Sequence, residues 1–226
     1  MTSSTEATTN ISTSSGRIIG ALFLTQMIGG ILVNFTLTSP LFGNPGFIVN
    51  GAVFENQIGM SALLGMVISS LSLVIAILVY PTFKQNSPAL ALGFLILSSI
   101  GLALSAVEQM GVMGMVSYSK TYAGLAAADQ GLLESMKGIV ASIRNWGHYT
   151  NLLFSGATLM VFYITLFRFK LVPLFLAGFG IIAVITQLST IAMPFFGYGV
   201  DFMLLAPLAL CQLSLSLWLM VKGFRV

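Results

Sequence analysis

Residues 88–116 read PALALGFLILSSIGLALSAVEQMGVMGMV, a run in which Glu108 is the one charged side chain. A helix that crosses the hydrocarbon core of a membrane needs about 20 consecutive apolar residues. The run is long enough, and five further segments of the chain share its apolar character: 18–38, 58–80, 146–167, 171–196 and 200–221. The sequence therefore predicts an all-α integral membrane protein, a bundle of about six transmembrane helices.

The composition of the chain supports this prediction. Of its 226 residues, 57% are hydrophobic and 7% are charged, with a mean hydropathy of +0.98, whereas a soluble domain carries about 25% charged residues. Six spans with short loops use nearly the whole chain and leave no length for a soluble catalytic domain. The net charge of +3 comes from scattered residues rather than a basic patch, so the lipid bilayer, and no nucleic acid, is the expected partner.

The chain divides into a tail and one predicted domain. Residues 1–16 are rich in Ser and Thr and have too few apolar side chains to bury a core, which predicts a disordered tail. Residues 17–226 form a single six-helix transmembrane domain. We expect no secretory signal peptide, because the tail lacks a basic stretch before an apolar one.

Residues 117–145 are predicted to be an amphipathic extramembrane segment. Apolar side chains recur there at three- to four-residue spacing, which is typical of an amphipathic helix; they are Leu125, Ala128, Leu132, Met136, Ile139 and Ile143. The segment either lies in the membrane interface or continues directly into the fourth span. It either packs on the bundle as a solvated extension or covers a ligand cavity.

The distribution of Lys and Arg predicts the orientation. With six spans both termini lie on one side, together with six basic residues: Arg17, Lys84, Arg168, Lys170, Lys222 and Arg225. The other side holds Lys120, Lys137 and Arg144. Basic residues favour the cytoplasmic side, so we expect a multi-pass protein of the cell (plasma) membrane with both termini cytoplasmic.

Three prolines are predicted to mark a turn or a kink. Pro81 and Pro88 are predicted to bracket a short turn between the second and third spans. Pro207 is predicted to kink the sixth span midway along its length, because proline removes a backbone donor from a helix.

Polar residues near the end of the third span and the start of the fourth are the candidate binding site. An ionisable group at membrane depth is expensive and marks a functional site by default. The candidate ligand-binding residues are Glu108, Gln109, His148 and Asn151, and Glu108 is a candidate partner for His148. The alternative interpretation is structural, with the same groups hydrogen-bonding between helices.

Several kinds of chemistry are disfavoured by residues that the sequence lacks. One His and one Cys do not make a two-histidine haem site or an ordinary zinc site. The chain has no H-E-x-x-H motif, no G-x-S-x-G motif and no glycine-rich phosphate loop. We therefore predict no catalytic residues, no metal ligands and no cofactor.

Several short motifs, in their order and spacing, resemble a bacterial family of polytopic membrane proteins catalogued as domain of unknown function 4386. There are five such motifs: a run that begins at Arg17, a run that ends at Glu108, the stretches Gly147–Tyr149 and Leu171–Pro173, and a run that ends at Phe224. The resemblance spans about residues 17–224 and implies a six-helix membrane protein without an assigned activity.

Two positions depart from the pattern that the resemblance implies. In the family an arginine often precedes the stretch that contains the glutamate of the third span, whereas this chain is uncharged before Glu108. A glutamate often precedes the terminal Leu-Trp-Leu run, where this chain has Gln212. If those two charges pair in relatives, this chain lacks the pair.

Three functions remain open from the sequence. The first is a protein that binds or transports a small molecule at a polar site near the outer ends of the third and fourth helices. The second is a structural or accessory membrane protein that acts through a partner protein. The third is an intramembrane enzyme, which requires Glu108 and His148 within hydrogen-bond reach as acid and base.

Overall fold

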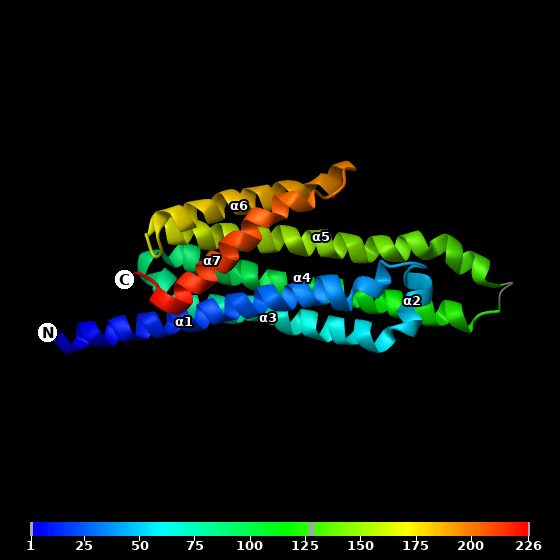
Figure 1. Ribbon diagram of the computed structural model, residues 1–226, viewed down its shortest axis with the longest axis horizontal. Helices are drawn as coiled ribbons and strands as arrows, with labels where there is room; N and C mark the ends of the chain where they lie inside the picture. Colours follow the sequence, from blue (N-terminus) through cyan, green and yellow to red (C-terminus); the bar gives the residue numbers. More distant parts are fainter. Residues whose placement is uncertain (1, 127–128, 226) are drawn as a thin grey trace. The chain divides into compact units, whose positions relative to one another are not determined.

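The chain is described by a computed structural model over residues 2–126 and 129–225, with side chains described from residue 15. Figure 1 shows the order of its elements. The α-helices are α1 (Thr2–Ile31), α2 (Phe47–Val53), α3 (Glu55–Asn86), α4 (Pro88–Gly124), α5 (Gln130–Arg168), α6 (Leu174–Ala192) and α7 (Ala206–Lys222). Shorter turns are the π-helical η1 (Leu32–Leu37) and the 3₁₀ turns η2 (Ser39–Leu41), η4 (Met193–Phe196) and η5 (Phe202–Leu205).

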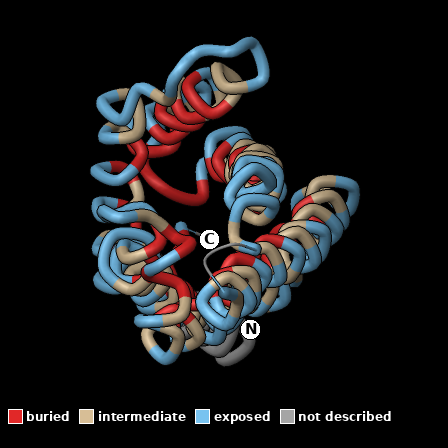
Figure 2. The backbone as a smooth tube through the Cα atoms, turned by 90° about the vertical axis from the view of Figure 1, so that its right-hand side faces the viewer, coloured by how far each residue is buried: buried red, intermediate tan, exposed pale blue. Residues whose placement is uncertain are grey.

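Within the described residues, six helical segments are long and apolar enough to cross a membrane, which confirms the predicted all-α membrane fold. They are Ser15–Leu41, Glu55–Asn86, Pro88–Gly124, Gln130–Arg168, Leu174–Phe196 and Phe202–Lys222. In the 18-residue apolar stretch that qualifies each segment as a span, between 22% and 44% of the residues are buried inside the protein. Figure 2 shows the consequence, with buried stripes along helices whose other faces are exposed. Such helices suit a lipid environment, because lipid covers the apolar faces that the protein does not.

The predicted amphipathic segment 117–145 belongs to two long helices. Residues 117–124 complete α4, and residues 130–145 are the first part of α5, which continues into the fourth span. Ala128 of the predicted apolar face lies outside the described residues. Four members of that face are exposed: Leu132, Met136, Ile139 and Ile143.

The N-terminal prediction falls partly outside the described residues. Helix α1 begins at Thr2, but the side chains of residues 1–14 are not among those described. The predicted disorder of residues 1–16 therefore stays a prediction.

The expectations for two prolines were wrong. Helix α3 continues through Pro81 to Asn86, so Pro81 does not end it. One missing N–H costs a single hydrogen bond, whereas ending a helix within a membrane would expose several backbone groups. Pro207 does not kink a span, because it lies in the first turn of α7, where its missing N–H has no helical partner to lose.

Contacts divide the chain into two compact units. Unit 1 comprises Met1–Met27, Ser70–Gly101 and Leu152–Val226, and unit 2 comprises Ile28–Ser69 and Leu102–Asn151. Helices α1, α3, α4 and α5 contribute residues to both units.

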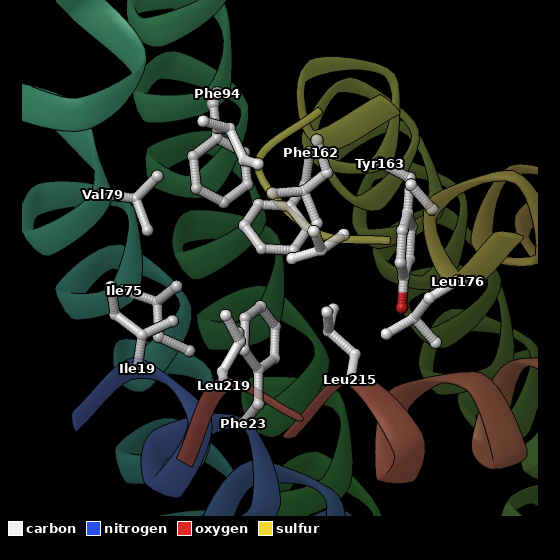
Figure 3. Close-up of a cluster of buried hydrophobic side chains, with 14 of the residues drawn as sticks. Ile19, Phe23, Ile75, Val79, Phe94, Phe162, Tyr163, Leu176, Leu215 and Leu219 are labelled. Carbon is white, nitrogen blue, oxygen red and sulfur yellow. The ribbon is translucent and has the colours of Figure 1, made fainter. Parts of the chain in front are cut away.

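Unit 1 has an aromatic core. Phe162 of α5 lies at its centre, with ring centroids 5.2 Å from Phe23, 5.7 Å from Phe83 and 5.4 Å from Phe94. These rings come from α1, α3, α4 and α5. Figure 3 shows Phe23, Phe94 and Phe162 together with Leu176 of α6 and Leu215 and Leu219 of α7. Tilted ring pairs at these distances are favourable beyond the area that they bury, so this core joins segments of α1, α3, α4, α5, α6 and α7.

The hairpin of α6 and α7 completes unit 1. The two helices lie side by side in Figure 1. Cys211 of α7 is buried, and its Sγ lies 3.7 Å from the Leu176 carbonyl oxygen of α6. Gly180 of α6 packs directly against the ring of Tyr163, which leaves no space for a side chain at that position.

Unit 2 is held together by a polar contact as well as an apolar cluster. The Ser119 hydroxyl of α4 donates to the Ile48 carbonyl at 2.6 Å and accepts from the Ala52 N–H at 2.7 Å. Gly51 lies between Ile48 and Ala52 in the sequence, and a Cβ there would be 2.7 Å from the Ser119 Cβ. Short helix α2 is therefore fixed to α4 through its backbone. The α4 and α5 segments that carry the candidate site both belong to this unit.

Candidate functional site

The carboxylate of Glu108 is buried and bonded to two side chains of α5. His148 Nδ1 lies 2.7 Å from Glu108 Oε1, and Asn151 Nδ2 donates to Glu108 Oε2 at 2.8 Å. The Glu108 side chain is 8% exposed and the His148 side chain 22%. The structure therefore brings together three of the four predicted site residues, all within unit 2.

Helical spacing explains why α5 supplies several partners to one carboxylate. Arg144, His148 and Asn151 are separated by four and three residues, and residues at this spacing share one face of a helix. Arg144 Nη2 lies 3.8 Å from Glu108 Oε1, with both side chains 8% exposed. A buried ion pair therefore adjoins the His148 contact.

Two glycines allow α4 and α5 to approach each other at the site. A Cβ at Gly111 of α4 would lie 3.1 Å from the Arg144 Cα, and one at Gly147 of α5 would lie 3.6 Å from the Glu108 Cα. Small residues permit such close approach between membrane helices. Each glycine thus faces a charged residue of the cluster on the opposite helix.

The Arg144 guanidinium has weaker contacts than the carboxylate beside it. Its Nη1 donates to Asn145 Oδ1 at 3.4 Å, near the limit for a hydrogen bond. Its Nε is buried and has no hydrogen-bond partner among the described residues. The Cζ atom lies 4.8 Å from the centroid of the Phe42 ring, a cation–π contact.

Gln109, the fourth predicted residue, points toward a different helix. Its side-chain amide packs against Gly65 of α3, with Nε2 2.9 Å from the position of an added Cβ. The Gln109 Oε1 atom is buried without a hydrogen-bond partner. Successive residues of a helix point about 100° apart, which separates Gln109 from the face that Glu108 uses. Its place in a ligand site stays a prediction.

The α4–α5 polar cluster consists of Glu108 of α4 and Arg144, His148 and Asn151 of α5. Its carboxylate and imidazole are in direct contact and have the geometry to exchange a proton along the bond between them. Among the described residues, no group of three or more His, Cys, Asp or Glu side chains is placed to hold a metal ion.

Arg144 and Phe42 were not among the site residues predicted from the sequence. The spacing of Arg144 from His148 and Asn151 was a signal that the arginine shares their face. Phe42 lies in the segment after η2, far from α5 in the sequence, and gave no signal of its own. Arg144 pairs with Glu108 itself, which is a different pair from the one that the family pattern implies, so the absence of that implied pair stays a prediction.

The fold and this cluster define a multi-pass membrane protein with a buried charged site. The family model "Domain of unknown function (DUF4386)" matches residues 18–223. The chain therefore belongs to this family, as the resemblance implied. A search of curated proteins and a search of solved structures found no match.

Proposed function

We propose that this protein binds or transports a small polar molecule at the α4–α5 polar cluster. The observation that carries the proposal is the direct contact of Glu108 with His148, next to Arg144. Buried ionisable groups in membrane helices are costly, and they mark substrate pathways and proton relays. A purely structural cluster needs hydrogen bonds but no charges, because neutral amides and hydroxyls also join membrane helices.

The position of the cluster along its helices supports access from one membrane face. Glu108 follows Pro88 by twenty residues along α4, and His148 precedes Arg168 by twenty residues along α5. At 1.5 Å per residue each distance is about 30 Å, which is about the thickness of the hydrocarbon core. A cluster at that distance from one interface lies near the other, where a polar molecule reaches it from water.

We also propose the plasma membrane as the location, with cytoplasmic termini. The support is the excess of Lys and Arg on the side of the termini, six residues against three. Fusion of alkaline phosphatase and of a fluorescent protein to the C-terminus tests the orientation. We expect fluorescence and no phosphatase activity, and the reverse would contradict the proposed topology.

Native mass spectrometry of the full chain, purified in a mild detergent, tests the binding proposal. We expect a defined additional mass on the wild type that Glu108→Gln loses. The matched control is Glu55→Gln, since Glu55 is also a glutamate of unit 2 paired with a base, Lys120 at 2.8 Å, but is exposed. An identical bare mass for the wild type and both variants would argue against the proposal.

A second function has support from the start of α5. Leu132, Met136, Ile139 and Ile143 are between 42% and 70% exposed, and their spacing of four, three and four residues is typical of a helix–helix seam. Ile139 precedes Arg168 by 29 residues, about 43 Å along α5, which is close to the full bilayer thickness including headgroups. Lipid tails do not cover a stripe at that distance, and this favours an accessory protein that acts through a partner helix.

Cross-linking distinguishes this second function from the first. In a Cys211→Ser background, Ile139→Cys carries a thiol-reactive photocross-linker on the exposed stripe, and Lys137→Cys is the control on another face of α5. A protein adduct specific to the Ile139 position, together with no bound small molecule in the mass spectrum, would favour the accessory function.

A further inference from the structure

The Arg144 guanidinium has more hydrogen-bond donors than acceptors around it. A guanidinium carries five N–H donors in a fixed planar arrangement. Around Arg144, the Asn145 contact is long at 3.4 Å, the Glu108 oxygen lies 3.8 Å away, and Nε has no partner. Since Arg144 is 7% exposed, water does not readily replace these missing acceptors. Burial of an arginine with unfilled donors is costly.

The nearby carboxylate does not fill this deficit, because its strong bonds go elsewhere. Glu108 directs Oε1 to His148 at 2.7 Å and Oε2 to Asn151 at 2.8 Å. Carboxylates that pair fully with arginine accept two parallel bonds at about 2.7–2.9 Å. Asn151 and His148 occupy the positions on Glu108 that such a bidentate pair would need.

We infer that Arg144 binds an oxyanion, a carboxylate or phosphate group, of the molecule that the α4–α5 polar cluster recognises. This inference rests on the proposed binding function and names the chemical class of its ligand. Carboxylate and phosphate groups match the planar donor set of arginine and accept two bonds at once. Such a group would accept from Nε and one Nη of Arg144, which are the donors that the protein leaves unfilled or weakly filled.

The ring of Phe42 lies over the guanidinium and controls access to it. The ring is 4.8 Å from the Arg144 Cζ, and Phe42 is 55% exposed. One side of the ring therefore faces the surroundings and the other faces the cation. An oxyanion reaches Arg144 after the ring rotates away, and charged hydrogen bonds replace the cation–π contact that is lost.

Isothermal titration calorimetry of the full chain in a non-ionic detergent tests the inference. The probes are sodium phosphate and sodium acetate at constant ionic strength, with sodium chloride as the reference anion. We expect saturable binding of phosphate or acetate that Arg144→Gln weakens at least tenfold. The matched control is Arg168→Gln, because Arg168 also lies over an aromatic ring, Phe169 at 5.6 Å, but is exposed on unit 1.

A second titration separates a lipid source from a soluble one. Short-chain phosphatidylglycerol carries the phosphate on a lipid, and the matched diacylglycerol lacks it. Saturation by the phosphatidylglycerol alone, again dependent on Arg144, assigns the oxyanion to a headgroup. Saturation by free phosphate or acetate assigns it to a solute.

Phe42→Ala tests the part assigned to the ring. We expect a lower half-saturating concentration of the oxyanion, because binding no longer has to displace the ring. An unchanged or higher value would overturn the role of Phe42 as a cover.

Calorimetry and native mass spectrometry together distinguish a failure of the oxyanion inference from a failure of the proposed binding function. If no oxyanion probe binds, but the mass spectrum shows a bound molecule that depends on Glu108, the oxyanion inference is overturned and the binding function stands. Equal binding to the wild type and Arg144→Gln also overturns the inference. If neither experiment detects a ligand, both proposals fall. Circular dichroism and gel filtration of each variant confirm that loss of binding is not loss of folding.

Discussion

Units 1 and 2 bury different kinds of side chain. Unit 1 has rings and aliphatic groups at its centre, around Phe162. Unit 2 has a smaller apolar cluster and, within the same unit, the buried charges of Glu108 and Arg144. Apolar packing stabilises a fold directly, whereas a buried ion pair is weak support for stability, because desolvation offsets its attraction. Apolar packing therefore dominates the interior of unit 1, whereas unit 2 also carries a buried ion pair.

The largest expected loss of stability is in unit 1. Phe162→Ala removes a fully buried ring that contacts three other phenylalanines, and such truncations cost about 3–5 kcal/mol. Unfolding by SDS titration of the purified protein measures the loss. Phe162→Leu retains much of the volume and is the matched control. A cost below about 1 kcal/mol for Phe162→Ala would contradict the central role of this ring.

A smaller loss is expected for the charge of Glu108. Glu108→Gln retains the shape of the side chain but leaves Arg144 without its negative neighbour, at a cost of about 1–3 kcal/mol. The double variant with Arg144→Gln removes both charges and should recover part of that cost, which SDS titration of the four proteins measures. Strictly additive losses would show that the two charges do not interact. They would contradict the statement that unit 2 carries a buried ion pair.

A loss of similar or smaller size is expected for the fixation of α2 in unit 2. Ser119→Ala removes one bond to Ile48 and one to Ala52, and neutral hydrogen bonds contribute about 1 kcal/mol each. Hydrogen exchange followed by mass spectrometry should show faster exchange in residues 47–53 and little change in residues 174–192 of unit 1. Uniformly faster exchange in both segments would mean that the units are not independent in stability.

The smallest effect is expected at the exposed pair of unit 2. Glu55→Gln breaks the ion pair with Lys120, whose side chains are 45% and 53% exposed, and exposed pairs contribute about 0–1 kcal/mol. The difference from wild type should vanish at about 1 M salt, where charges are screened within about 3 Å. A loss as large as that of Glu108→Gln would remove the distinction between buried and exposed carboxylates in this unit.

The prediction of the site from the sequence was partial for identifiable reasons. Glu108 is conspicuous because a charge interrupts an apolar run, and His148 and Asn151 were found because polar residues cluster at the start of the next span. The direction of each side chain depends on helix phase. Gln109 adjoins Glu108 in sequence but packs against Gly65 of α3, whereas Arg144, which is distant in sequence, shares the face of His148.

The prolines show that local sequence does not determine where a helix ends. Pro81 and Pro207 have similar local signals, yet one lies inside α3 and the other in the first turn of α7. Local sequence identifies a residue that lacks a donor. Whether the helix continues depends on which neighbouring groups satisfy the backbone, and that is a property of packing.

Composition and the length of its apolar runs were enough to determine that this chain is an all-α membrane protein with six candidate spans, because the cost of exposing apolar surface to water and unpaired backbone groups to lipid depends on local sequence alone. Tertiary structure decided which polar groups meet. The bonds from Glu108 to His148 and Asn151, the incomplete pairing of Arg144 and the position of Phe42 over it all depend on how segments far apart in the chain pack together.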